Sequence, residues 1–106
     1  MNIAQMMKQA QVMQERMAEL QERLGETELT ATAGNGLVNV VMTCNGRLRK
    51  INIDPKVVNP SDVETLEDLI IAAINSGKEA GDARMADETR AMMAGMGLPA
   101  GMKLPF

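Results

Sequence analysis

Apolar residues near the start of the chain recur at alternating spacings of three and four, which is the heptad pattern of a coiled-coil seam. The residues between them are mostly Gln, Glu, Arg, Lys and Ala, which are good helix formers. The pattern predicts one helix over residues 3–24, ended by Gly25 because glycine is a common C-terminal cap. A seam this narrow suits a single partner helix, which belongs either to the same chain or to a second subunit. The seam residues are Ile3, Met6, Ala10, Met13, Met17, Leu20 and Leu24.

The middle of the chain changes to the two-residue alternation of β-strands. Asn35-Gly36 and Asn45-Gly46 have the preferred sequence of type I′ hairpin turns, in which both central residues need a positive φ. These two turns bracket a strand over residues 37–44, and flanking strands are expected over about 27–33 and 47–53. The three strands therefore form an antiparallel meander in the order of the sequence.

The third of these strands breaks the strict alternation. Leu48 and Ile51 are three residues apart and can share one face of the sheet only if the strand contains an extra residue. The sequence therefore predicts a β-bulge at Arg49-Lys50.

Helical periodicity returns after residue 61 and continues over about residues 62–94. An unbroken helix of this length is about 50 Å long, whereas a compact domain of this size is only roughly 33 Å across. The far end must then protrude or lie on a second subunit. Gly77 and Gly81 are the weakest points of this helix, because each glycine costs about 1 kcal/mol relative to alanine, and the sequence leaves open whether the helix is continuous through them.

These elements predict an α+β domain over residues 1–94 with the order α-β-β-β-α. Its three-stranded antiparallel meander, in the order 1-2-3, packs with a long N-terminal helix and a long C-terminal helix. The remaining residues, 95–106, contain three Gly and two Pro and are expected to form a flexible tail.

Composition narrows the possible functions. The 106 residues include no His and a single Cys, Cys44, so the chain offers no His-based nucleophile system and no zinc site of His and Cys ligands. With no Trp, no Tyr and one Phe, it lacks the aromatic platforms that stack on single-stranded bases. The sequence therefore predicts a protein that is not an enzyme, with no catalytic residue, no metal and no small-molecule substrate.

Targeting signals are missing from the sequence as well. No apolar run approaches the ~20 residues of a membrane span, and the first residues do not form a secretory signal. A lone cysteine also fits a reducing compartment. We expect a cytoplasmic protein with no membrane partner.

Short motifs follow one another along nearly the whole chain, of which the longest is the ten-residue run at 66–75. They are residues 6–11 (MMKQAQ), 13–15 (MQE), 36–38 (GLV), 51–55 (INIDP), 66–75 (LEDLIIAAIN), 98–99 (LP) and 103–106 (KLPF). In this order the motifs resemble the YbaB/EbfC family of bacterial nucleoid-associated proteins.

The resemblance implies a small homodimer that binds duplex DNA with low or modest sequence specificity. Helical projections from the two subunits of such a dimer are expected to grip the duplex like tweezers. The implied roles are nucleoid organisation and gene regulation, with no catalytic activity or cofactor. The implied partners are therefore duplex DNA and a second copy of the chain, and the implied location is the bacterial nucleoid.

Contacts with DNA phosphates require Lys or Arg side chains. Six helical cations are the candidates for these contacts, and a further basic cluster of Arg47, Arg49 and Lys50 surrounds the third strand. Several helical cations have acidic neighbours at helical spacing. The pairs are Glu19 with Arg23, Lys78 with Asp82, Arg84 with Glu88, and Asp87 with Arg90. The six candidates are Lys8, Arg16, Arg23, Lys78, Arg84 and Arg90.

The overall charge argues for a second possible function. Fourteen acidic and eleven basic residues give the chain a formal charge of −3, so its average field does not attract DNA. The first helix is also rich in Met, whose flexible side chain suits adaptable protein contacts. The alternative is a Met-rich helical adaptor that binds a protein partner and does not contact DNA directly.

Overall fold

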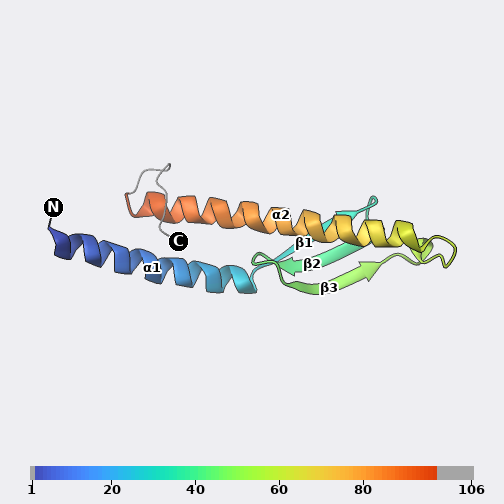
Figure 1. Cartoon of the computed structure of the whole chain (residues 1–106), viewed down its shortest axis with the longest axis horizontal. Helices are drawn as coiled ribbons and strands as arrows, with labels where there is room; N and C mark the ends of the chain where they lie inside the picture. The colour runs from blue at the N-terminus through green and yellow to red at the C-terminus, as the bar shows by residue number, and fades with distance from the viewer. Residues whose placement is uncertain (1, 98–106) are drawn as a thin grey trace.

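The computed structural model describes residues 2–97, which form two long helices and a three-stranded sheet in the order α-β-β-β-α (Figure 1). The predicted α+β fold class is therefore confirmed. The tail predicted over residues 95–106 lies outside the described residues from position 98 onward. The elements are α1 (Ile3–Glu26), β1 (Glu28–Ala33), β2 (Val38–Thr43), β3 (Leu48–Ile53), the 3-10 helix η1 (Pro55–Val57) and α2 (Val63–Gly95).

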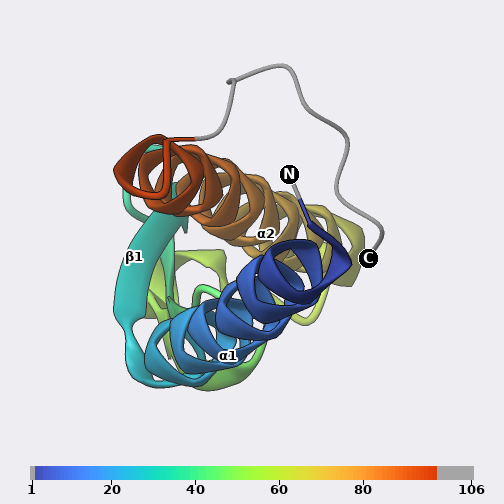
Figure 2. The same ribbon diagram turned by 90° about the vertical axis from the view of Figure 1, so that its left-hand side faces the viewer.

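The molecule is elongated because α2 is much longer than the sheet that it covers. Its extents are 69 × 23 × 18 Å, and its radius of gyration is 19.1 Å against about 13 Å for a compact domain of 100 residues. The first half of α2 lies over the sheet, and its second half runs beside α1 (Figures 1 and 2). We call α1 together with this second half of α2 the arm. The helix is continuous through Gly77 and Gly81, so neither glycine breaks it.

The turn between β1 and β2 has the predicted geometry. Asn35 and Gly36 have φ values of 55° and 91°, and the Leu37 N–H donates a hydrogen bond to the Gly34 carbonyl oxygen at 3.2 Å. These are the features of a type I′ turn.

The prediction of a second type I′ turn is wrong. The Gly46 N–H donates to the Thr43 carbonyl oxygen at 3.0 Å, which makes Cys44 and Asn45 the two central residues. Only Gly46, with a φ of 92°, has a positive φ here. The geometry is a type I turn followed by a left-handed glycine, the usual alternative when a hairpin loop is one residue longer.

The predicted β-bulge is confirmed. Val41 pairs with Lys50 and Met42 pairs with Leu48, so Arg49 is the extra residue of β3. The bulge resets the alternation, and Leu48 and Ile51 therefore both lie on the face that α2 covers on the neighbouring strands.

The main core lies between α2 and the first two strands. Val38, Val40 and Met42 are 0–2% exposed and pack with Ala31 and Ala73. Figure 1 shows that β3 is the edge strand farther from α2. The core is thus formed by α2, β1 and β2, and β3 supplies mainly its Ile53.

Small residues on α2 bring this helix close to the sheet. Ala73, Gly77 and Gly81 follow each other at one-turn spacing and are all buried. A Cβ on Gly77 would lie 2.5 Å from the Met42 Sδ, and a Cβ on Gly81 would lie 2.8 Å from the Cys44 carbonyl oxygen. The strip is therefore a packing surface for the Met42 side chain and for the Cys44 backbone.

The helix α1 reaches the sheet only with its last turns. Leu20 and Leu24 are buried with Cys44 in a second apolar cluster, to which Met17 and Met85 add their side chains. With Leu29 of β1, this cluster joins α1, β1, the β2–β3 turn and α2 at the root of the arm.

Gly25 does not end α1, which corrects the sequence prediction. The helix continues to Glu26, and Thr27 caps it by donating from its N–H and Oγ1 to the Arg23 carbonyl oxygen at 3.0 and 2.8 Å. A Cβ on Gly25 would lie 3.0 Å from the Asn45 Nδ2. The glycine therefore makes room for the β2–β3 turn, and its role is steric.

Replacing Gly81 with alanine is expected to destabilise the protein although alanine is the better helix former. The new methyl group meets backbone atoms that have no room to move, so the free energy of unfolding falls by about 1–3 kcal/mol. Urea unfolding at fixed protein concentration measures this change. Gly95→Ala is the control, because nothing lies within 4 Å of its Cβ position, and it changes stability by less than about 1 kcal/mol. Equal stability of the two variants would refute the close packing of α2 on the Cys44 backbone.

Candidate nucleic-acid interface

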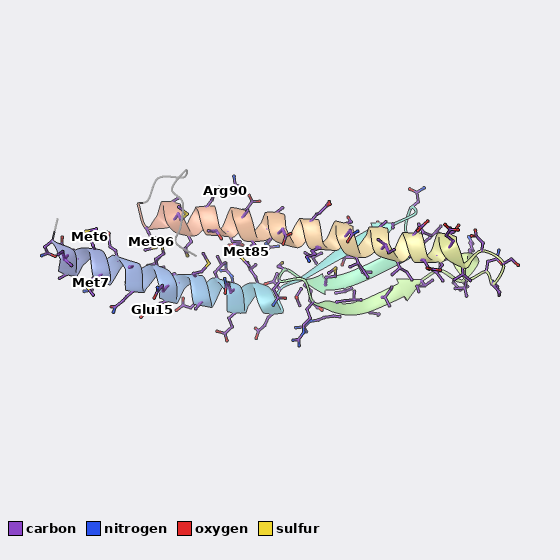
Figure 3. All side chains as sticks on the ribbon, in the orientation of Figure 1. Met6, Met7, Glu15, Met85, Arg90 and Met96 are labelled. Carbon is purple, nitrogen blue, oxygen red and sulfur yellow. The ribbon has the colours of Figure 1, made fainter. Side chains whose placement is uncertain are left out.

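The apolar seam of α1 is divided into two halves with different surroundings. Met17, Leu20 and Leu24 pack within the chain, whereas the seam residues Ile3 and Met6 are 76% and 54% exposed, and Met7 beside them is 62% exposed. Figure 3 shows Met6 and Met7 near the free end of α1. Of the two partners that the seam allows, a helix of the same chain thus covers the seam residues at the root of the arm.

The two helices of the arm enclose an open cleft of about 790 Å³. The cleft is amphipathic, since apolar side chains from both helices line it together with five charged ones. Its lining residues are Val12, Glu15, Arg16, Glu19, Leu20, Arg23, Glu88, Ala91 and Met92. A smaller cleft beside it lies near the free end of the arm, where Lys8 and Gln9 of α1 face Met96.

Glu88 makes two ion pairs, one of which connects the two helices of the arm. Its Oε2 lies 2.8 Å from the Arg23 Nη2, and its Oε1 lies 3.6 Å from the Arg84 Nε. The Arg23–Glu88 pair joins residues 65 positions apart in the chain. One carboxylate therefore partly neutralises two of the predicted DNA-contacting cations.

Helical spacing predicted some of these ion pairs correctly. The pairs Arg84–Glu88 and Asp87–Arg90 are present. Arg23 pairs with Glu88 on the other helix and not with Glu19, and the ion pairs within residues 2–97 do not include Lys78 with Asp82. The spacing of residues along one helix cannot predict an ion pair with a residue of another helix, such as Arg23 with Glu88.

The six predicted cations do not form one continuous surface. Lys8 and Arg16 line the two clefts of the arm, while Arg90 lies on the outer side of α2 (Figure 3). Lys78 directly follows Gly77, which packs on Met42, so it belongs to the part of α2 above the sheet. The structure thus brings five candidates to the arm and leaves Lys78 apart from them.

Residues 2–97 contain no group of three His, Cys, Asp or Glu side chains that is arranged to hold a metal ion. Cys44 is a buried free thiol. Among the described residues, no helix has the length and apolar character needed to cross a bilayer.

The long two-helix arm on a three-stranded antiparallel sheet defines a small α+β protein whose exposed helices carry the cations. The chain belongs to the YbaB/EbfC DNA-binding family, whose model matches residues 1–96. The family resemblance predicted from the sequence is therefore confirmed, and so is the DNA-binding, nucleoid-associated class of protein.

Individual relatives match over almost the whole chain. A nucleoid-associated protein of Rhodospirillum centenum is 49% identical over 105 residues, which cover 99% of this chain and 98% of that protein. A nucleoid-associated protein of Xanthomonas oryzae pv. oryzae is 50% identical, with coverage of 99% and 97%. The crystal structure of an uncharacterized protein from Helicobacter pylori has the same fold, with a TM-score of 0.76 at 24% identity over 88% of this chain and 98% of that one.

The ion pair between Arg23 and Glu88 is expected to add little to stability. Both side chains reach solvent, so a double-mutant cycle with Arg23→Ala and Glu88→Ala is expected to give a coupling free energy of about 0.2–1 kcal/mol. The coupling, measured by urea unfolding, falls in 1 M salt, where the Debye length is about 3 Å. A cycle between Lys8→Ala and Glu88→Ala is the control and is additive to within about 0.5 kcal/mol. Absence of coupling for Arg23 at both salt concentrations would contradict the ion pair.

Proposed function

We propose that this chain is a bacterial nucleoid-associated protein that binds duplex DNA as a homodimer with low or modest sequence specificity. It thereby contributes to nucleoid organisation and gene regulation in the cytoplasm. The observation that carries the proposal is the match to a DNA-binding family over residues 1–96, together with relatives at about 50% identity that are named nucleoid-associated proteins.

The arm offers a first surface for phosphate contacts. It presents Lys8 and Arg16 without a carboxylate partner among the ion pairs of residues 2–97, and Arg23, Arg84 and Arg90 with one. The side chains of the three paired arginines are 54–62% exposed, so a phosphate can compete with their carboxylate partners. Two arms in a dimer would hold a duplex between them, as the family resemblance suggests.

Binding is expected to be weak and sensitive to salt. Two chains carry a formal charge of −6, so local cations and not the average field must attract the DNA. Phosphate contacts release counterions, and the association constant therefore falls steeply as the salt concentration rises.

Fluorescence anisotropy of a labelled 30-base-pair duplex, titrated at several salt concentrations, tests direct DNA binding. Six phosphate contacts predict a slope of about −5 for the logarithm of the association constant against the logarithm of the salt concentration. Lys8→Gln reduces the slope by about 0.9 for each contact that it removes, whereas Lys56→Gln, on η1 at the other end of the molecule, leaves it unchanged. Absence of binding even at low salt would exclude the proposal.

The dimer interface that we propose lies on β3. Leu48 and Ile51 lie on the face of the sheet that α2 covers elsewhere, yet they are 43% and 38% exposed. They continue two rows of core residues across the sheet, because Leu48 pairs with Met42 and Ile51 pairs with Val40. A second copy placed on these side chains would complete the core that α2 leaves open.

Ile51→Glu is expected to separate the dimer into monomers because it places a charge in an apolar interface. The expected increase in the dimer dissociation constant is at least ~30-fold, which corresponds to the loss of a residue worth about 2 kcal/mol. Sedimentation equilibrium measures it. Asn52→Glu is the matched control, since Asn52 pairs with Asn39 on the opposite face, and it leaves the dimer intact. An unchanged dimer in Ile51→Glu would place the interface elsewhere.

The exposed apolar end of α1 favours the second candidate function. Ile3, Met6 and Met7 form an uncovered apolar group, which is a suitable surface for a protein partner. If the duplex does not bind at low salt, the adaptor function explains this surface better than DNA binding does.

A further inference from the structure

Residues 29–53, which form most of the sheet, have an excess of positive charge. Between Glu28 and Asp54 the chain has no acidic residue and three basic ones, Arg47, Arg49 and Lys50. The helix α2, in contrast, has seven acidic and three basic side chains. Local positive charge is therefore concentrated on β3, away from the helices to which the DNA contacts are assigned.

The bulge in β3 places two of these cations on the same face. Leu48 and Ile51 lie on the α2 side of the sheet, and Arg49 and Lys50 are the two residues between them. Both oppose the single residue Val41, so both are directed away from α2. Without the bulge, strict alternation would separate neighbouring side chains onto opposite faces.

The surroundings of these cations on the uncovered face are mostly polar, and one carboxylate, that of Glu28 on β1, also lies on this face because Glu28 pairs with Thr43. Asn39 pairs with Thr32 on one side and with Asn52 on the other, while Val41 pairs with Thr30 and Lys50. Hydroxyl and amide groups of this kind also donate hydrogen bonds to phosphate oxygens. The face therefore has charge and hydrogen-bond donors but no aromatic side chain that would stack on bases.

Arg47 is held at the end of the sheet next to the root of the arm. Its N–H donates to the Thr43 Oγ1 at 3.1 Å, and its carbonyl oxygen accepts from the Thr43 N–H at 2.8 Å. The Cys44 N–H in the same turn donates to the Leu24 and Thr27 carbonyl oxygens at 3.1 and 3.0 Å. The start of β3 is thus attached to the end of α1.

The three sheet cations also differ from the arm cations in their partners. All three are exposed, and the ion pairs within residues 2–97 include none of them. Three of the five arm candidates have a carboxylate partner. A phosphate that binds the sheet cations displaces no such partner.

We infer that the uncovered face of β3 with Arg49 and Lys50, together with Arg47 in the turn just before it, is a second binding surface for the DNA sugar–phosphate backbone, at the root of the arm. This inference rests on the proposed DNA-binding function. The surface is not expected to read base sequence, because contacts with phosphates carry no sequence information directly. It adds affinity and salt dependence to binding by the arm.

A purely structural explanation exists for the same residues. Charged side chains and bulges on an edge strand prevent it from pairing with the edge of another sheet. Under this explanation, removal of the charges promotes aggregation and leaves the salt dependence of DNA binding unchanged.

The experiment compares the wild-type chain with the triple variant Arg47→Gln, Arg49→Gln and Lys50→Gln, using anisotropy of a labelled 30-base-pair duplex. Loss of three phosphate contacts is expected to make the slope of the logarithm of the association constant against the logarithm of the salt concentration less negative by about 2.7. Between 50 and 200 mM salt, the wild-type affinity then falls about 40-fold further than that of the variant. Sedimentation and circular dichroism of the variant check that it remains folded and does not aggregate.

Two single variants give a matched comparison. Lys50→Gln and Lys56→Gln each remove one positive charge from an exposed lysine. Only Lys50→Gln is expected to make the slope less negative, by about 0.9. The double variant Arg47→Lys and Arg49→Lys keeps the charges and is expected to retain most of the affinity.

The outcomes separate the inference from the proposed function. If the wild-type chain binds DNA and the folded triple variant has the same slope, the sheet surface is wrong and DNA binding by the arm stands. If the wild-type chain does not bind DNA even at low salt, the proposed function itself fails. If Lys50→Gln and Lys56→Gln both make the slope less negative by the same amount, the effect is one of general charge, and the assignment to β3 is overturned.

Discussion

The close approach of α2 to the sheet is the contact on which the rest of the structure depends. Gly77 and Gly81 let the helix rest on Met42 and on the Cys44 backbone, so the helix axis follows the sheet. A straight helix fixed in this way over its first half has a second half with no sheet beneath it. That overhang meets the end of α1 through Met85, Leu20 and Leu24, and this meeting creates the arm. The elongated shape therefore follows from two glycines and from helix length.

Local patterns determined most of what could be predicted from the sequence. The turn at Asn35-Gly36 and the bulge at Arg49 depend on residues within one hairpin, so their chemistry is visible in a short stretch. The seam of α1 also predicted its helix, although the helix ends later than expected. Gly25 has the typical sequence of a cap, but its role depends on Asn45, twenty residues further along the chain. Only tertiary packing distinguishes a glycine that ends a helix from one that gives space to a neighbour.

The candidate site was less predictable for the same reason. Helical spacing identifies cations and their neighbours along one helix, but it contains nothing about which helix lies opposite. The contact between Arg23 and Glu88 exists because α2 overhangs the sheet and meets α1. Likewise, the sequence indicated a basic cluster near β3, but the register across Val41 decides that Arg49 and Lys50 share a face. The strand register, and not closeness in sequence, places these charged side chains on the same face of the sheet.

These arrangements explain how an acidic chain can have a surface suited to DNA. The acidic side chains are concentrated on α2, where Glu88 and Asp87 form ion pairs with arginines. Residues 29–53, in contrast, contain three cations and no carboxylate. Exposed ion pairs are worth at most about 1 kcal/mol, so the arm arginines remain accessible to phosphate at a small cost. The sheet cations avoid even that cost because no carboxylate of the described residues pairs with them. Per charge, β3 is therefore the more favourable surface for a phosphate, although the arm is the more prominent projection.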